Sequence, residues 1–258
     1  MVTSLQSPND LLAALPSAQF NLLRPYLRTM VLDFGQVLIE AGAPVRQVIF
    51  PHSGIVSTLA RLQRGETIEV GVVGRDGVVG ATSALFGVPS SCAAVVRFSG
   101  AASAIDASHF RAVAELSPAL REALLRDQSS RTIKAEQTAA CNAAHTAEAR
   151  LCRRLLQSRE MAGSDCMLLS QDLMAQMLGV KRNTISLIAH GLQQQGLIRY
   201  SRGRMAILDV EGLIRRSCEC RSADRVPVAV LPLRSSATVV MQRPAPGSEF
   251  GQAQRSPS

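Results

Sequence analysis

The run from Ser170 to Leu192 constrains the fold of this chain more than any other stretch, because it predicts two short helices packed around a tight turn. Apolar residues recur at helical spacing on both sides of Gly179, so the two segments can bury a common face. That shared core is predicted to contain Met174, Leu178, Val180, Ile185 and Ile188. Ser170 supplies a hydroxyl that can cap the first helix, and Gly179 stands where a left-handed turn favours glycine. The pattern is typical of a helix-turn-helix.

The second helix of this pair has a face that the shared core does not use. The helix begins at Lys181 without a Ser, Thr or Asp cap, so its first amides can meet a phosphate. An arginine can donate two hydrogen bonds to guanine, an asparagine can pair with adenine, and a leucine can lie against a thymine methyl group. The residues expected to contact bases in a major groove are Arg182, Asn183, Ser186, Leu187 and His190.

Two short apolar runs surround a Ser-Arg-Gly-Arg turn between Gly196 and Leu208. This arrangement predicts a β-hairpin beside the helix pair, the wing of a winged helix-turn-helix. Phosphate contacts from such a wing fix the register on DNA without reading its sequence. The residues expected to hold phosphates are Gln171, Lys181, Thr184, Arg202 and Arg204. Two alternatives stay open, namely an ordinary helical pair with solvated charges and a winged helix that binds protein without touching DNA.

The stretch from Leu169 to Leu208 resembles the carboxy-terminal domain of the CRP/FNR superfamily of transcription regulators. Its Ser-Gln-Asp start, its Leu-Gly-Val-Lys-Arg turn and its Gly-Leu-Ile and Arg-Gly runs carry the resemblance, which extends more weakly over nearly the whole chain. In that family the residue matching Arg182 contacts a base. The two other base-reading positions, usually Glu and Arg, are here Asn183 and Leu187. The resemblance therefore implies a homodimer on a palindromic operator that differs from the family's best-known site.

Charge is unevenly distributed along the 258 residues. Residues 1–144 carry 12 basic and 11 acidic side chains, whereas residues 145–258 carry 16 and 9. The positive excess therefore lies with the predicted DNA-binding half. A basic chain would also suit RNA or an anionic membrane, but the helix pair and the wing favour duplex DNA. No run approaches membrane-spanning length and no signal segment is evident, so we expect a cytoplasmic protein that binds no membrane.

The first hundred residues alternate short apolar runs with Gly and Pro turns, after a short helical opening from Ser7 to Leu27. The expected strands are Val37–Ile39, Val45–Phe50, Ile55–Leu62, Thr67–Val73 and Ala93–Phe98. Such spacing favours a sandwich or jelly roll, and the resemblance implies a β-roll of the cyclic-nucleotide-binding type. The expected fold class is α+β, with an N-terminal double-stranded β-roll that is jelly-roll-like, a long dimerisation helix and a C-terminal winged helix-turn-helix.

The effector pocket departs from the family pattern at its charged positions. Family members that bind cyclic nucleotides hold the ribose with a Gly-Glu pair and the phosphate with an Arg-Ser pair. Here the matching positions are Gly80-Ala81 and Ser91-Cys92, so the carboxylate and the guanidinium are both missing. Arg75 or Arg97 is a possible substitute. We expect an effector other than cyclic AMP, or none. The alternative is a cyclic-nucleotide-responsive or redox-responsive regulator with a divergent pocket.

Cysteine and histidine usage predicts no metal, no iron–sulfur cluster and no catalytic residue. The amino-terminal region lacks the closely placed thiols that a cluster needs. Cys141 and Cys152 lie about three helical turns apart and could share a face, but buried thiols are the preferred interpretation. Cys218-Glu-Cys220 is a local pair for metal binding or oxidation, but a lone pair of this kind favours a structural role. We found no nucleophile motif or phosphate-binding glycine loop, so we expect no enzyme.

A helix from about Pro118 to Ala144 is predicted between the two halves, followed by an amphipathic helix from Glu148 to Glu160. The apolar stripe expected on the first of these helices contains Leu116, Leu120, Leu124, Leu125, Ile133, Ala139, Ala140 and Cys141. The expected divisions are a sensor β-roll (1–115), a dimerisation helix (116–144), a DNA-binding domain (145–221) and a disordered tail (222–258). The expected partners are double-stranded DNA and a second copy of the chain, and RNA polymerase is also considered.

Overall fold

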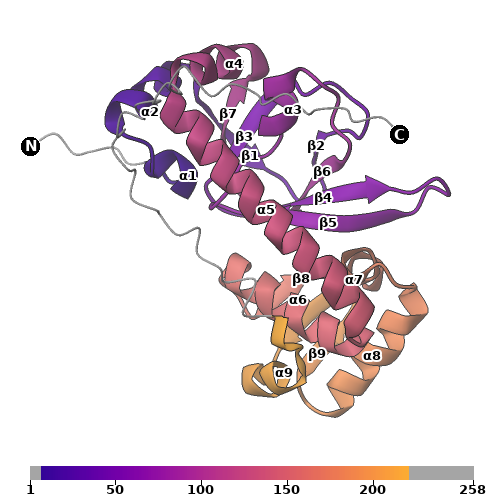
Figure 1. Cartoon of the computed structure of the whole chain (residues 1–258). Helices are drawn as coiled ribbons and strands as arrows, with labels where there is room; N and C mark the ends of the chain where they lie inside the picture. Colours follow the sequence, from indigo (N-terminus) through magenta and orange to yellow (C-terminus); the bar gives the residue numbers. More distant parts are fainter. Residues whose placement is uncertain (1–6, 221–258) are drawn as a thin grey trace, which may run out of the picture. The chain divides into compact units, whose positions relative to one another are not determined.

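A computed structural model describes residues 7–220, and the tail expected from residue 222 onward lies outside them. The described chain has an α+β fold, with a β-rich amino-terminal part, a long helix and a helical carboxy-terminal part that carries a small sheet (Figure 1). This order is the one expected from the sequence. No helix among residues 7–220 combines the length and the apolar character needed to cross a membrane.

Two antiparallel sheets form the β-roll. One sheet has the order β2-β6-β4-β5 and the other has the order β1-β7-β3. Apolar side chains of both sheets form one core, which includes fully buried Leu32, Val56 and Val96. The strands are β1 (Arg28–Leu32), β2 (Val37–Ile39), β3 (Gln47–Pro51), β4 (Ile55–Arg61), β5 (Thr67–Val73), β6 (Ala93–Phe98) and β7 (Gly100–Asp106). The five expected strands are therefore present, and β1 and β7 are additional.

Short helices flank the β-roll and bury its second apolar cluster. They are α1 (Asp10–Ala13), α2 (Ser17–Leu23), the 3-10 helix η1 (Arg24–Tyr26), α3 (Ala81–Phe86) and α4 (Ala107–Leu116). Asn9 caps α1, because its side-chain oxygen accepts from the Leu12 amide at 3.0 Å. Its amide nitrogen donates to the carbonyls of Pro51, Arg75 and Gly77, so this one buried side chain ties the amino-terminal helices to two turns of the roll.

The long helix α5 (Pro118–Ala144) begins at the β-roll and runs to the carboxy-terminal helices (Figure 1). Ser117 caps it by accepting from the Leu120 amide, and Pro118 occupies its first turn. The expected apolar stripe is divided between two faces. Leu120, Leu124 and Cys141 are buried, whereas Leu125, Ile133, Ala139 and Ala140 are exposed. Leu116, which was expected in this stripe, is the exposed last residue of α4 instead, because the helix breaks at Ser117.

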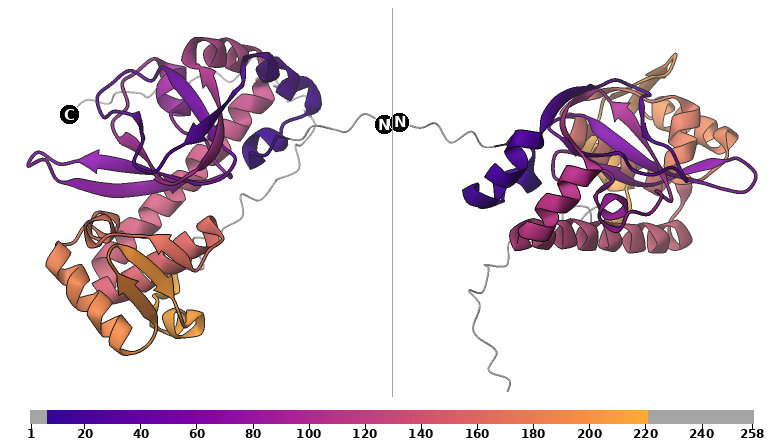
Figure 2. Two further views of the ribbon diagram at one scale, coloured as in Figure 1. Left: turned by 180° about the vertical axis from the view of Figure 1, so that it is seen from behind. Right: turned by 90° about the horizontal axis from the view of Figure 1, so that it is seen from above.

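The winged domain contains four helices and a three-stranded sheet of order β8-β10-β9. Its elements are α6 (Ala147–Ala162), β8 (Cys166–Leu168), α7 (Gln171–Leu178), α8 (Arg182–Gln194), β9 (Ile198–Ser201), β10 (Arg204–Ile207) and α9 (Val210–Arg216). The views of Figure 2 show the sheet and α9 (orange to yellow) beside the helix pair. Leu151, Cys152, Leu155 and Leu156 of α6 face its core, as the amphipathic pattern predicts.

The β-roll and the winged domain contact each other through β5 and α7. Arg97 of β6 donates to the side-chain oxygen of Gln176 on α7 at 2.9 Å. Arg154 of α6 forms an ion pair with Glu69 of β5, whose carboxylate also accepts from the Ser57 hydroxyl. Both charges of this pair are largely buried, so the contact is a defined polar junction between the two parts.

Candidate DNA-binding interface and ligand cavity

The helix pair α7 and α8 has the local geometry that the sequence predicts. Ser170 accepts from the Leu173 amide at 3.1 Å and so caps α7. Gly179 ends α7 with φ of +65°, in the left-handed region that glycine adopts cheaply. Met174, Leu178 and Ile185 are buried in the domain core, and Val180 and Ile188 pack against it partly buried. The predicted core of the pair is confirmed.

The described residues do not cover one face of α8. Arg182, Asn183, Ser186, Leu187 and His190 are all exposed, whereas Ile185, Ala189 and Leu192 on the opposite face are buried. Leu187 is 76% exposed, so its apolar side chain is open to contact with a partner. Arg182 lies 3.6 Å from the Asp172 carboxylate in an exposed ion pair. Such a pair is worth about 0–1 kcal/mol, so a base or a phosphate can compete for the guanidinium.

The wing is a hairpin with a two-residue turn. Arg202 and Gly203 both have positive φ, of 48° and 76°, and Ser201 pairs with Arg204 across the turn. Positive φ at both central positions defines a type I′ turn, whose twist matches that of the flanking strands. Arg202 and Arg204 are exposed here, and together with Arg199 they border one groove beside β8. The hairpin therefore presents three guanidinium groups on one small sheet.

The residues predicted to hold phosphates fall into two exposure classes. Lys181, Arg202 and Arg204 are exposed, whereas Gln171 and Thr184 are half-buried. Lys181 precedes α8 without a side-chain cap, so the first amides of that helix have no side-chain acceptor there, as expected. Gln171 donates to the Ser186 hydroxyl at 3.5 Å, which links the start of α7 to the exposed face of α8. Their contacts with phosphate stay predictions.

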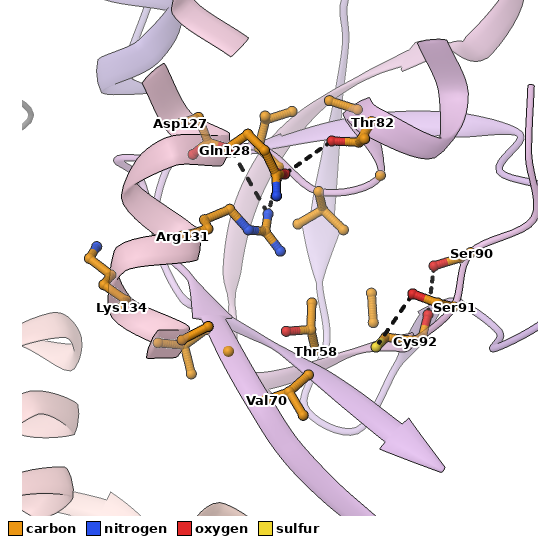
Figure 3. A pocket seen from close by; sticks show the side chains of 18 of the residues that line it. Thr58, Val70, Thr82, Ser90, Ser91, Cys92, Asp127, Gln128, Arg131 and Lys134 are labelled. Atoms are coloured by element: carbon orange, nitrogen blue, oxygen red, sulfur yellow. Dashed lines mark hydrogen bonds and ion pairs between the residues drawn. The ribbon is translucent and has the colours of Figure 1, made fainter. Parts of the chain in front are cut away.

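A cavity of about 270 Å³ lies between the β-roll and α5 (Figure 3). Gly80, Ala81, Ser91 and Cys92, the four residues predicted for the effector pocket, all line it. They come from the start of α3 and from the loop before β6, so the fold brings together two short runs that are ten residues apart in the sequence. The effector role of these four residues stays a prediction.

Three charged groups of the cavity come from α5 and a fourth, Arg154, comes from α6, and all four were missed in the sequence. Asp127, Arg131 and Lys134 line the cavity at helical spacing, which is a signal that the sequence does contain. Arg131 extends into the cavity, where it donates to the Val78 carbonyl at 2.9 Å, and Lys134 turns away from the centre (Figure 3). Lys134 lies 3.6 Å from the Asp76 carboxylate.

Neither arginine considered as a substitute phosphate ligand lines this cavity. Arg75 is exposed and donates to both carboxylate oxygens of Asp10, at distances of 2.7 to 3.1 Å. Arg97 turns to Gln176 on α7 instead. Strand alternation alone did not determine these directions, and both side chains instead hold other parts of the fold.

Asp127 is an unusual lining group, because its carboxylate is largely buried. Burial raises its pKa to about 6, and nearby Asp76 acts in the same direction, while the charges of Arg131 and Lys134 oppose the rise. Arg131 lies 4.0 Å away on the next turn of α5. Deprotonated Asp127 makes this wall of the cavity less favourable for an anion.

Two family models match the chain in the order of its two halves. A cyclic nucleotide-binding domain matches residues 30–117, and a Crp-like helix-turn-helix domain matches residues 149–216. Together the two matches cover more than half of the chain. The first coincides with the β-roll and the second with the winged domain. The chain belongs to the CRP/FNR superfamily. It is thus a transcription regulator with a DNA-binding winged helix-turn-helix.

Solved structures of CRP/FNR regulators share this fold. A transcriptional regulator of the crp/fnr family from Eubacterium rectale aligns with a TM-score of 0.68 at 17% identity, over 81% of this chain and 98% of its own. FixK2 from Bradyrhizobium japonicum gives 0.63 at 18%, over 74% and 98%. The c-di-GMP responsive regulator CLP from Xanthomonas campestris gives 0.64 at 14%, over 75% and 100%. A comparison with curated proteins finds no match.

The cysteines of this CRP/FNR regulator are not arranged as the spacing suggested. Cys141 and Cys152 are both buried thiols, as the preferred interpretation predicts. The alternative of a shared helix face is wrong, because α5 ends at Ala144 and the two residues belong to different helices and different clusters. Cys141 instead lies beside Cys218 and Cys220, which follow α9. All six cysteines are free thiols. Sequence spacing could not reveal this contact, because the partners are 77 residues apart.

Proposed function

We propose that this regulator binds a palindromic operator as a homodimer and reads its bases through the exposed face of α8. The observation that carries the proposal is the continuous exposed face formed by Arg182, Asn183, Ser186, Leu187 and His190 beside the arginines of the wing. A helix of this kind fits a major groove, and a basic hairpin next to it can hold the flanking phosphates. The role proposed is cytoplasmic and non-enzymatic, with RNA polymerase as the partner at the promoter.

The exposed face of α5 supports a second copy of the chain as the partner. Leu125 is 71% exposed and Ile133 is 44% exposed, and exposed Ala139 and Ala140 continue along the helix. Apolar side chains along a long helix are covered efficiently by a symmetry-related helix, and small alanines allow close approach. A twofold axis along α5 would place two α8 helices about 34 Å apart, one turn of DNA.

The cavity supports an effector other than cyclic AMP. Ala81 and Ser91 offer neither a carboxylate for a ribose nor a guanidinium for a phosphate. Arg131 is held by the Val78 carbonyl, and Asp127 brings a carboxylate into the same wall. The two other cationic side chains of the lining are also paired, Lys134 with Asp76 and Arg154 with Glu69. Polar but uncharged groups, including Thr58, Thr82 and Ser90, make up much of the remaining lining. A small polar ligand that needs little anionic recognition therefore suits the cavity.

The DNA-binding proposal is tested by selecting genomic fragments and random duplexes on the purified full chain. We expect one palindrome to be enriched. Arg182→Ala should weaken its binding by about 1–3 kcal/mol and relax one position in each half-site, because one base contact is lost. Arg202→Ala should weaken all sequences alike and reduce the salt slope by about 1, because it removes a phosphate contact.

Arg28→Ala is the matched control, because Arg28 is an exposed arginine on β1 of the β-roll. We expect it to keep both the operator sequence and the affinity. Unchanged sequence preference after Arg182→Ala would contradict the base-reading role, and a lack of any enriched duplex would contradict the proposed function. Calorimetric titration of the chain with cyclic AMP should give no binding heat, and saturable binding that strengthens operator affinity would overturn the effector proposal.

A further inference from the structure

Four metal-ligating side chains meet where the long helix ends. Cys141 lies in the last turn of α5, His145 follows that helix directly, and Cys218 and Cys220 follow α9. Their three sulfur atoms and one ring nitrogen all lie within 4.8 Å of one another. The three cysteines are buried, at 0%, 5% and 7% exposure, and His145 is partly buried. Residues from two distant parts of the chain thus form one compact donor set.

Two separations within this set match those around a single tetrahedral ion. Zn–S bonds of about 2.3 Å and Zn–N bonds of about 2.0–2.1 Å require neighbouring sulfurs about 3.8 Å apart and a sulfur and nitrogen about 3.6 Å apart. The Cys141 and Cys218 sulfurs are 3.5 Å apart, and the Cys220 sulfur is 3.6 Å from Nδ1 of His145. The remaining pairs, at most 4.8 Å apart, need to close by about 1 Å to reach the same geometry.

The surrounding groups suit a bound cation. Nε2 of His145 lies 3.1 Å from the Glu219 carboxylate, so that bond can hold the Nε2 proton and direct the Nδ1 lone pair toward the sulfurs. Gln137 donates from its amide to the Cys220 sulfur at 3.1 Å. Arg153 is buried, and its charge opposes the effect of burial on the pKa of Cys141. A guanidinium so placed would offset the net negative charge of three thiolates around a divalent ion.

We propose that Cys141, His145, Cys218 and Cys220 form a structural Zn²⁺ site. Three thiolates and one imidazole make a closed donor set, the kind found in structural rather than catalytic zinc sites. Binding replaces three thiol protons, which pass to the solvent, and leaves the ion four-coordinate without a water. An iron–sulfur cluster fits less well, because its ligands bind different irons and so stand farther apart than four donors on one ion.

The ion would fix the junction between the long helix and the winged domain. The chain turns at His145 and Thr146, between α5 and α6, and the site ties this turn to the segment that follows α9. Protein contacts already join these segments, among them the His145–Glu219 and Gln137–Cys220 bonds described above. The Cys218 amide donates to the Ala149 carbonyl at 3.4 Å, and Arg216 pairs with Glu148. Loss of the ion would leave only these hydrogen bonds and ion pairs, together with the Cys141–Cys218 contact, among the described polar contacts at the junction.

The test measures metal on the tag-free full chain, isolated in reductant, stripped with a chelator, reloaded with Zn²⁺ and passed over a gel-filtration column. We expect about one Zn²⁺ per chain and a higher melting temperature in the loaded form. Co²⁺ in place of Zn²⁺ should give the thiolate charge-transfer and ligand-field bands of a tetrahedral site. Cys220→Ser and His145→Gln should each lower retained Zn²⁺ at least tenfold, measured on the fraction with native circular dichroism.

Cys166→Ser is the matched control, because Cys166 is an exposed thiol of the same domain outside the cluster. It should retain as much Zn²⁺ as the parent chain. Two results would overturn the proposal: no retained metal, or equal retention by the cluster variants and the parent. Metal content is measured without DNA, so a negative result for the Zn²⁺ site would leave the proposed operator binding unaffected. A failure to bind an operator would likewise leave the Zn²⁺ proposal unaffected.

Discussion

Replacing Asp127 by Asn should stabilise the protein, and the gain should grow with pH. Asp127 has a side chain that is only 12% exposed, and its burial raises the pKa to about 6 from the ordinary value of 3.8. A carboxyl with a raised pKa binds more protons in the folded state than in the unfolded state. Folding stability therefore falls as pH rises from about 4 to about 6, and the loss is complete above that range.

The size of the effect follows from the two pKa values. Linkage shows that the raised pKa of Asp127 lowers the free energy of unfolding by about 1.5 kcal/mol at pH 5 and by about 3 kcal/mol at pH 7.5. Asn has nearly the same shape and carries no charge, so Asp127→Asn should remove this cost. The attraction to Arg131 opposes burial and is already included in the shifted pKa. The variant should therefore exceed the parent in unfolding free energy by these amounts.

Urea unfolding followed by far-ultraviolet circular dichroism suits this protein, which contains no tryptophan. The free energies of unfolding of the parent and Asp127→Asn are compared at several pH values from 4.5 to 8. Asp33→Asn removes an exposed carboxyl after β1 and should change stability by no more than about 0.5 kcal/mol throughout. A pH-independent difference for Asp127→Asn, or a less stable variant at pH 7.5, would refute the reasoning.

Further predictions concern the winged domain. Gly179→Ala should destabilise by about 1–2 kcal/mol, because φ of +65° strains a side chain even though the new methyl meets only Ile68 at 3.5 Å. Gly191→Ala, inside α8 with open space around it, should instead stabilise by about 0.5–1 kcal/mol, and calorimetry that finds the same sign for both would contradict this pair. Leu155→Ala should cost about 2–5 kcal/mol in unfolding free energy, and a loss below 1 kcal/mol would show that the fully buried site can collapse.

The helix-turn-helix could be predicted closely because its signals are local. The Ser170 cap, the left-handed Gly179 and the spacing of Met174 and Ile185 all lie within a few residues of the contacts that they determine. The two missed strands of the β-roll show the opposite case. Most of β7 is Gly, Ala and Ser, which have little intrinsic strand preference, yet it pairs with both β1 and β3. Burial between its neighbours decides its conformation there.

The sites show the same division between local and long-range information. Gly80 and Ser91 could be placed in one cavity through the family resemblance, but the side chains that α5 contributes depend on how that helix crosses the β-roll. Arg131 was overlooked for this reason, although its spacing from Asp127 was visible. The cysteine cluster depends on a contact between the end of α5 and the segment that follows α9, so neither Cys141 nor the Cys218-Glu-Cys220 run indicates it alone.

The position of β5 has a practical consequence for finding the unknown signal. Val70, Gly71 and Val72 of this strand border the cavity, and the same strand contacts α7, which packs against α8, the helix proposed to read bases. Suppose that β5 can take two positions relative to α7 and that a ligand binds these two conformations with different affinities. The ligand then changes operator affinity, and thermodynamic linkage requires the operator to change ligand affinity by the same factor. A short operator duplex is therefore a screening reagent, because metabolites whose binding tightens or weakens when it is added are the candidates for the natural effector.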